Sequence, residues 1–125
     1  MSVTALPEQL SDAARAFAGR EHRLLIDGEL VPAASGATFE TLDPSTGRAI
    51  ASLAQAGPED VDRAVQAARA ALSGPWGAAS AAERARLLNR LADLIEAAGD
   101  ELAQLASLDN GTPVKRAKLV DVWGP

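Results

Sequence analysis

Cysteine is absent from this sequence of 125 residues, and histidine occurs once, at His22. Without thiols, these residues cannot form a disulfide, a thiolate metal site or a cysteine nucleophile. His22 stands between Glu21 and Arg23, and neither a serine nucleophile nor a second metal ligand accompanies it in the sequence. We therefore expect His22 to be a solvated surface residue.

Aromatic residues are scarce, at 3% of the chain: Phe17, Phe39, Trp76 and Trp123. The hydrophobic share is an ordinary 47%, but alanine dominates it. Because aromatic side chains bury the largest areas in a core, we expect few bulky anchors and weak packing within the chain itself. The length allows one domain at most.

The chain also lacks a basic cluster and a long apolar run. Its net charge is -5, and its Lys and Arg residues are scattered among Asp and Glu. Phosphate binding needs clustered basic residues, so the pattern argues against a nucleic-acid partner. No apolar run approaches the roughly 20 residues that span a bilayer, and the N-terminus has no signal-peptide pattern. We expect no membrane partner and a cytoplasmic location.

The N-terminal part of the chain reads as a tail followed by a β-hairpin. Residues 1–21 are expected to form the tail, with disorder over 1–6 and a short amphipathic helix over 7–18. Residues 22–125 then belong to the domain proper. Asp27-Gly28 lies between two short apolar runs, which is the strongest local signal of a hairpin turn.

A second hairpin is predicted from residue 38 onward. Alternating residues predict strands at 38–42 and 49–54. The segment Asp43-Pro44-Ser45-Thr46-Gly47 between them has the composition of a turn, with Asp43 as a turn former.

The apolar period then changes from two residues to 3.6, which predicts helices. Pro58 opens a helix over 58–72, and Gly74-Pro75 ends it. Ser80 and Glu83 form a capping-box pattern before a helix over 83–98.

Two further helices are predicted near the C-terminus. Gly99-Asp100 interrupts the pattern, a short helix follows, and Asn110-Gly111 closes it. Thr112 is expected to cap a last helix, with Pro113 at its first position, that runs to about Val122.

The predicted fold class is therefore α+β, with two N-terminal β-hairpins followed by three or four helices. Strand–helix–strand alternation does not occur, so these residues cannot assemble a complete parallel sheet. The apolar faces of the helices over 58–72 and 83–98 must bury against each other, a second copy or another protein. We expect the isolated chain to be marginally stable or to self-associate.

Six segments carry a resemblance to a known family, in order, spacing and detail: LLIDGELV (24–31), TFETLDPSTGR (38–48), PEDVDRAVQAARAAL (58–72), GPW (74–76), ERARLLNRLADLIE (83–96) and LASLDNGTP (105–113). Together they resemble the opening of an NAD(P)-dependent aldehyde dehydrogenase. The resemblance extends over residues 22–122, nearly the whole chain. It implies the opening part of the family's α/β cofactor-binding domain, in which the helices cover a sheet whose strands come later.

The resemblance also implies that the family's catalytic cysteine, general-base glutamate and main cofactor-binding residues lie beyond this segment. The complete enzyme uses NAD or NADP to oxidise an aldehyde to an acid. We expect no catalytic residue and no cofactor-binding residue in this chain, and no activity from it alone. Trp76, in the GPW match, is expected to be a packing anchor.

One site is implied by the resemblance. In some family members the positions of Thr41, Leu42 and Asp109 help to hold a structural monovalent cation, which needs several oxygen ligands. The alternative is that Asp109 is a helix-terminal carboxylate hydrogen-bonded to the backbone.

Two functional hypotheses follow. The chain is the N-terminal fragment of an aldehyde dehydrogenase, inactive alone. Alternatively, it is a non-catalytic binding or assembly module, or a split-enzyme subunit, that docks on a complementary or full-length aldehyde dehydrogenase chain. The sequence determines neither the aldehyde substrate nor the choice between NAD and NADP.

Overall fold

The structure is a computed structural model, which describes residues 6–122 and Gly124. The expected disorder over 1–6 falls almost entirely on residues outside this part, as do Trp123 and Pro125. The chain divides into two compact units, which are described separately. Unit 1 comprises Met1–Glu21, Glu40–Ser52 and Leu91–Pro125, and unit 2 comprises His22–Phe39 and Leu53–Arg90.

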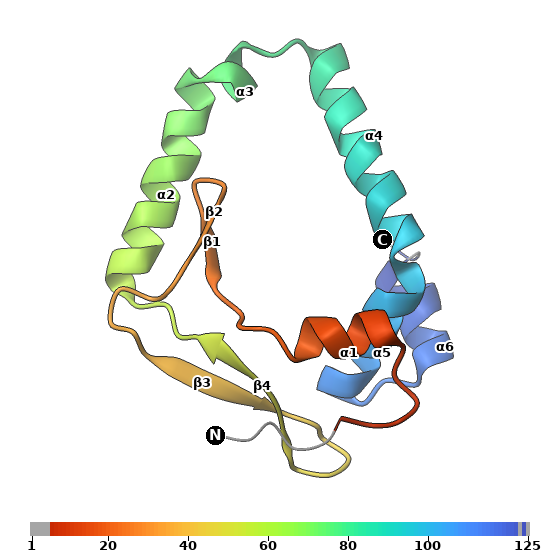
Figure 1. Ribbon diagram of the computed structural model, residues 1–125. Coiled ribbons are helices and arrows are strands. Elements are labelled where there is room, and N and C mark those ends of the chain that lie inside the picture. The colour runs from red at the N-terminus through yellow and green to blue at the C-terminus, as the bar shows by residue number, and fades with distance from the viewer. Residues whose placement is uncertain (1–5, 123, 125) are drawn as a thin grey trace. The chain divides into compact units, whose positions relative to one another are not determined.

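Both predicted hairpins form. β1 (Leu24–Ile26) pairs antiparallel with β2 (Glu29–Val31), and Leu25 lies opposite Leu30. Asp27 and Gly28 have φ values of 53° and 78°, the positive values that a two-residue hairpin turn requires. β3 (Thr38–Leu42) pairs with β4 (Ala49–Ala54), within the predicted bounds (Figure 1).

The helices follow the predicted order. The expected helices are α2 (Pro58–Ser73), α4 (Ala81–Ala97), α5 (Gly99–Asn110) and, at the C-terminus, α6 (Val114–Ala117), which continues as a π-helical turn, η1 (Lys118–Val122) (Figure 1). A further short helix, α3 (Pro75–Ala78), occupies the corner after α2. The α+β fold class is confirmed.

Several boundaries differ from the predictions. The first helix, α1 (Asp12–Ala18), begins at residue 12 rather than 7, because Ser11 is its N-cap and its hydroxyl accepts from Ala14 N. Thr112 does not cap the last helix. Pro113 takes that place, and Thr112 N instead donates to Asn110 Oδ1 at 2.8 Å.

Two single-residue predictions were wrong in degree. His22 is half-buried rather than solvated, because its carbonyl accepts from Ala54 N and its backbone bridges to Leu53. Trp76 is 41% exposed rather than an enclosed anchor, since the four-residue helix α3 contacts mainly α2.

Unit 1 is built around alanines. α1 packs on α5 through buried Ala14, Ala18 and Ala103, and Ser11 N donates to Gln104 Oε1 at 2.7 Å. At the N-terminal end of α5, Lys118 Nζ lies 2.5 Å from Asp100 Oδ1. Small side chains let these helices approach closely but bury little area, as the scarcity of aromatics predicted.

Unit 2 contains the β1–β2 hairpin, α2, α3 and the first part of α4. Its buried apolar residues are Ile26 and Ala33, and α2 contacts β1. The large side chains Val61, Val65 and Leu72 on α2 remain 44–69% exposed.

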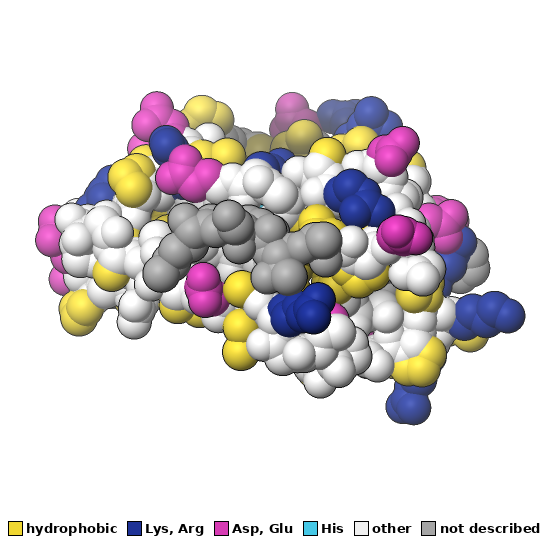
Figure 2. Space-filling model, turned by 60° about the horizontal axis from the view of Figure 1, so that its bottom comes forward, with side chains coloured by type: hydrophobic (Ala, Val, Ile, Leu, Met, Phe, Trp, Pro, Cys, Tyr) yellow, Lys and Arg dark blue, Asp and Glu magenta, His cyan; other side chains and the backbone are white. Residues whose placement is uncertain are grey.

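On the face shown in Figure 2, acidic and basic side chains are interspersed, with hydrophobic side chains between them. Within the part of the chain that the structure describes, none of the helices combines the length and apolar character needed to cross a membrane.

Candidate functional site

The structure brings together two of the three residues predicted to hold a cation. Thr41, half-buried on β3, donates its hydroxyl hydrogen from Oγ1 to Asp109 Oδ1 at 2.6 Å. Asp109 is the second-last residue of α5. The contact lies within unit 1 and joins the second hairpin to the C-terminal end of α5.

The end of α5 comes close to the hairpin because of a glycine. Gly111 ends the helix in the left-handed conformation, with φ 77°, and its N–H donates to Ser107 O. A Cβ at this position would lie 3.2 Å from Pro44 Cγ in the hairpin turn. A residue without a side chain therefore satisfies both the backbone angle and the close approach.

The third predicted ligand, Leu42, follows Thr41 on β3 and is 50% exposed. The leucine side chain contains no oxygen, so Leu42 could offer a cation only its carbonyl oxygen. The donor set of carboxylate, hydroxyl and carbonyl oxygens suits a hard cation. Residues 6–122 and 124 contain no group of three or more His, Asp or Glu side chains placed to hold a metal ion.

Next to this contact, Asp43 organises the turn between β3 and β4. Its Oδ1 accepts from Ser45 Oγ at 2.7 Å and from Ser45 N at 2.8 Å, and its Oδ2 accepts from Thr46 Oγ1 at 2.7 Å. The hydrogen bonds from the Ser45 and Thr46 hydroxyls lower the pKa of Asp43 below its ordinary value of 3.8. The predicted turn former is thus an ionised carboxylate whose oxygens are committed to the turn.

A hollow of about 200 Å³ lies beside this turn in unit 1, lined partly by Asp43, Gln104, Ser107 and Leu108. Gln104 Oε1 accepts from Ser11 N, and the Asp43 oxygens are occupied by the turn. The polar contacts of Asp43 and Gln104 therefore hold α1 and the turn in place, and they are not arranged for acid–base chemistry.

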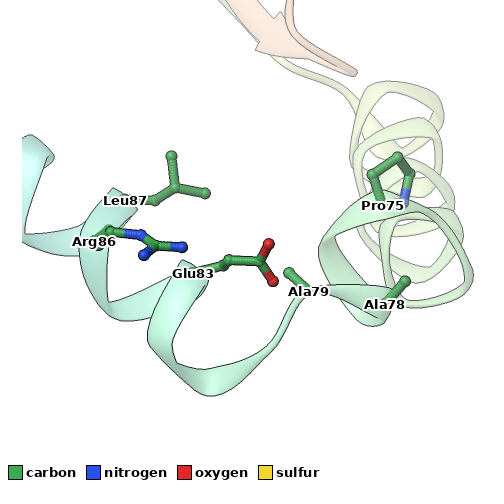
Figure 3. Close-up of a pocket in the computed structure, with 6 residues that line it drawn as sticks. All are labelled: Pro75, Ala78, Ala79, Glu83, Arg86 and Leu87. Atoms are coloured by element: carbon green, nitrogen blue, oxygen red, sulfur yellow. The ribbon is translucent and has the colours of Figure 1, made fainter.

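A second hollow, of about 490 Å³, lies between α3 and α4 in unit 2 and is lined by Pro75, Ala78, Ala79, Glu83, Arg86 and Leu87 (Figure 3). Glu83 Oε2 accepts from Ser80 N at 2.8 Å and from Ser80 Oγ at 2.7 Å, which lowers the Glu83 pKa. This is the predicted capping box, completed by Glu83 N donating to Ser80 Oγ. Its carboxylate serves the helix start and is a poor general acid.

The most buried acidic residue of the described part of the chain, Asp60, was not among the predicted site residues. Asp60 is 2% exposed and accepts from Ala34 N at 3.0 Å and Gly57 N at 3.0 Å. Arg63 Nη1 lies 3.6 Å from Asp60 Oδ1. The signal was present, because Asp60 stands three residues after the N-cap Gly57, as in a capping box.

Comparison with known proteins shows the family to which the chain belongs. The model of the "Aldehyde dehydrogenase family" matches residues 30–123. The chain belongs to the aldehyde dehydrogenase family. The matched segment includes Thr41, Leu42 and Asp109 and most of the six sequence segments that suggested the family.

Individual family members agree. The chain is 44% identical to the putative aldehyde dehydrogenase DhaS of Bacillus subtilis over 96% of its length, and 50% identical to the mitochondrial aldehyde dehydrogenase family 2 member B4 of Arabidopsis thaliana over 80%. An NAD⁺ complex of aldehyde dehydrogenase from Bacillus cereus matches 92% of the chain with a TM-score of 0.89 and 46% identity.

The chain matches only a small part of the length of each relative. The chain spans 24% of DhaS, 19% of the Arabidopsis protein and 24% of the Bacillus cereus chain. These 125 residues therefore correspond to about a fifth to a quarter of an aldehyde dehydrogenase. This confirms the predicted relationship to an N-terminal segment of the family.

Proposed function

We propose that this chain supplies the N-terminal part of an NAD(P)-dependent aldehyde dehydrogenase. The observation that carries the proposal is the TM-score of 0.89 with the Bacillus cereus enzyme, whose structure contains NAD⁺. The tail over 1–21 precedes a segment over 22–125 that forms the opening of the enzyme domain. We retain the cytoplasmic location as a prediction.

The reaction transfers a hydride from the aldehyde carbon to the nicotinamide, and water provides the second carboxylate oxygen. A thiolate nucleophile, oxyanion donors and a general base divide this chemistry into two easier steps. The 125 residues contain no cysteine, so the nucleophile must come from elsewhere in the enzyme.

The sequence also has no glycine-rich phosphate loop, so we assign none of its residues to NAD or NADP. The role of these residues is structural. Asp60 fixes the start of α2, and the Thr41–Asp109 hydrogen bond fixes the end of α5.

A chimeric enzyme tests this proposal. The segment of the Bacillus cereus enzyme that matches this chain is replaced by these 125 residues, and NADH formation is followed with a panel of aldehydes. We expect turnover by the chimera, and none by the isolated chain or by the Bacillus cereus enzyme that lacks the segment. A folded chimera without turnover would contradict the proposal.

We further propose that Thr41, Leu42 and Asp109 contribute oxygen ligands to a structural monovalent cation in the assembled enzyme. The close Thr41–Asp109 contact and the oxygen donor set support it. The thermal midpoint of the chimera is measured in KCl, NaCl and tetramethylammonium chloride at one ionic strength. We expect K⁺ or Na⁺ to raise the midpoint, and Asp109→Asn to remove that rise while Asp93→Asn on α4 retains it. Equal midpoints in all three salts would reject the site.

A second function, that of an assembly module, is favoured by one observation. The large apolar side chains of α4 are exposed. The isolated chain should therefore self-associate or bind a hydrophobic dye, which sedimentation and dye fluorescence measure.

A further inference from the structure

The C-terminal end of α5 carries an asparagine that is followed by a glycine. Asn110 is the last residue of α5, its side chain is exposed, and Gly111 ends the helix. The sequence contains one other asparagine, Asn89, which is exposed within α4 and is followed by Arg90. The two asparagines therefore share exposure and helical structure, and they differ in the residue that follows each of them.

A backbone nitrogen can attack the side-chain amide of the asparagine that precedes it. Here the Gly111 nitrogen loses its proton and forms a bond to Asn110 Cγ, and the Cγ–Nδ2 bond breaks to release ammonia. Water then opens the cyclic imide at either of its two carbonyl carbons, which gives aspartate or isoaspartate without oxidation or reduction. Glycine has no Cβ that would hinder the attack, whereas Arg90 has one.

One hydrogen bond in the structure favours this attack. Thr112 N donates to Asn110 Oδ1 at 2.8 Å. A donor on this oxygen withdraws electron density from Cγ and stabilises the negative charge that Oδ1 gains when the nitrogen adds. The exposed side chain is also in contact with the water that the second step consumes. The amide of Asn110 is therefore polarised and accessible.

A second hydrogen bond opposes the attack. Gly111 N donates to Ser107 O at 2.9 Å, as part of the left-handed helix end with φ 77°. A nitrogen whose proton is held by a carbonyl oxygen is harder to deprotonate, and the helix fixes its position. Because helix ends open locally at a small cost in free energy, this restraint is lost each time the last turn of α5 opens.

We propose that Asn110 is a site of spontaneous deamidation that the end of α5 restrains, and that isoaspartate formed there loosens the contact of α5 with the second hairpin. Isoaspartate lengthens the main chain by one methylene and moves the Gly111 N–H out of register with Ser107 O. It does so where even a Cβ on Gly111 would lie 3.2 Å from Pro44 Cγ. Water is the only other reactant, so the reaction does not depend on the proposed enzyme function.

Mass spectrometry of the incubated protein tests the site. The 125-residue chain is kept at mildly alkaline pH, in buffer and in guanidinium chloride, and is digested at intervals. An isoaspartyl methyltransferase detects isoaspartate in the peptides that contain Asn110 and Asn89. We expect faster deamidation at Asn110 than at Asn89, and a rate at Asn110 on the order of tenfold higher in the denaturant than in buffer. Equal rates at the two asparagines in the denaturant, or equal rates of Asn110 in the two solutions, would overturn the proposal.

Matched variants on β3 test the restraint. Thr41→Val removes the hydroxyl that donates to Asp109, next to Asn110, whereas Thr38→Val makes the same change at the start of β3. We expect Thr41→Val to accelerate the deamidation of Asn110 in buffer by on the order of fivefold, and Thr38→Val to leave it unchanged. In guanidinium chloride all three proteins should react at one rate, which separates a lost restraint from a change in intrinsic reactivity. Equal rates of the two variants in buffer would contradict the restraint.

Hydrogen exchange tests the effect of the product. The isoaspartate form, made by incubation in the denaturant, is refolded and separated by chromatography. Asn110→Asp is the control, because it carries the same charge, keeps the length of the main chain and still offers Thr112 N an acceptor. We expect the Gly111 amide to exchange on the order of tenfold faster in the isoaspartate form than in Asn110→Asp. Equal exchange in the two proteins would show that the modification does not loosen the contact.

Discussion

Thr41 and Asp109 lie 68 residues apart in the chain, yet the Thr41 hydroxyl donates to the Asp109 carboxylate at 2.6 Å. This contact joins β3 to α5 within unit 1, next to the close approach of Gly111 and Pro44. The hairpin turn and the helix end therefore hold each other through one polar and one steric contact.

Thr41→Val should lower the free energy of unfolding by about 1 kcal/mol, because it removes the hydroxyl donor while it keeps the side-chain shape. Urea titration of the 125-residue chain measures the change. Thr38→Val, at the other end of β3, is the matched control and should have a smaller effect. If the two valine variants were equally stable, the Thr41–Asp109 bond would contribute nothing.

Asp60→Ala should cost about 2–3 kcal/mol of stability, since it leaves the N–H groups of Ala34 and Gly57 without their carboxylate acceptor. Asp60→Asn keeps one acceptor oxygen and should cost less. Asp62→Ala, an exposed acidic position on the same helix, is the control. Urea midpoints that were the same for the alanine variants at 60 and 62 would refute the bridging role.

Gly77→Ala should destabilise the α2–α3 corner by about 1–3 kcal/mol, because the new Cβ would overlap the Leu72 carbonyl group. Gly74→Ala is a matched control three residues away, where the nearest atoms lie at ordinary contact distances of 3.6 and 3.7 Å. Thermal unfolding of both variants compares them. A Gly77→Ala protein that melts no lower than Gly74→Ala would contradict the close approach.

The Asp43 turn makes stability depend on pH. The folded-state pKa of Asp43 is lowered, chiefly by the Ser45 hydroxyl, so its stabilising contribution is present above 3.8 and is lost as the pH falls through the folded value. Ser45→Ala should lower stability at neutral pH but reduce the loss on acidification. Urea midpoints across this range, with the Asp43 carboxyl followed by NMR, provide the measurement. The Glu83 titration should stay unchanged, and an unaltered Asp43 titration would contradict the assignment.

Local signals in the sequence determined most of the elements. Asp27-Gly28 dictates a two-residue turn because both positions need positive φ, and the structure has φ 53° and 78° there. The Ser80–Glu83 capping box and the end of α5 at Gly111 are equally local, since each involves residues within one helical turn. Such patterns act over a few residues and need no knowledge of the rest of the fold.

The predictions from sequence failed where competing local signals or tertiary contacts determined the structure. Thr112 had the composition of an N-cap, yet its N–H pairs with Asn110 and Pro113 takes the cap position. Asp60 lies in the first turn of α2, where an acidic side chain interacts favourably with the helix dipole. Its burial depends on Ala34, 26 residues earlier, whose N–H it accepts.

For the candidate site too, the sequence predicted one part and only the tertiary structure determined the other. The family resemblance selected Thr41, Leu42 and Asp109, and the sequence by itself determined the strand and the helix that carry them. Only the tertiary structure decided that Thr41 and Asp109 form a hydrogen bond at 2.6 Å. The physical reason is distance along the chain: turns and caps follow from neighbouring residues, whereas contacts over 68 positions depend on how separate elements pack.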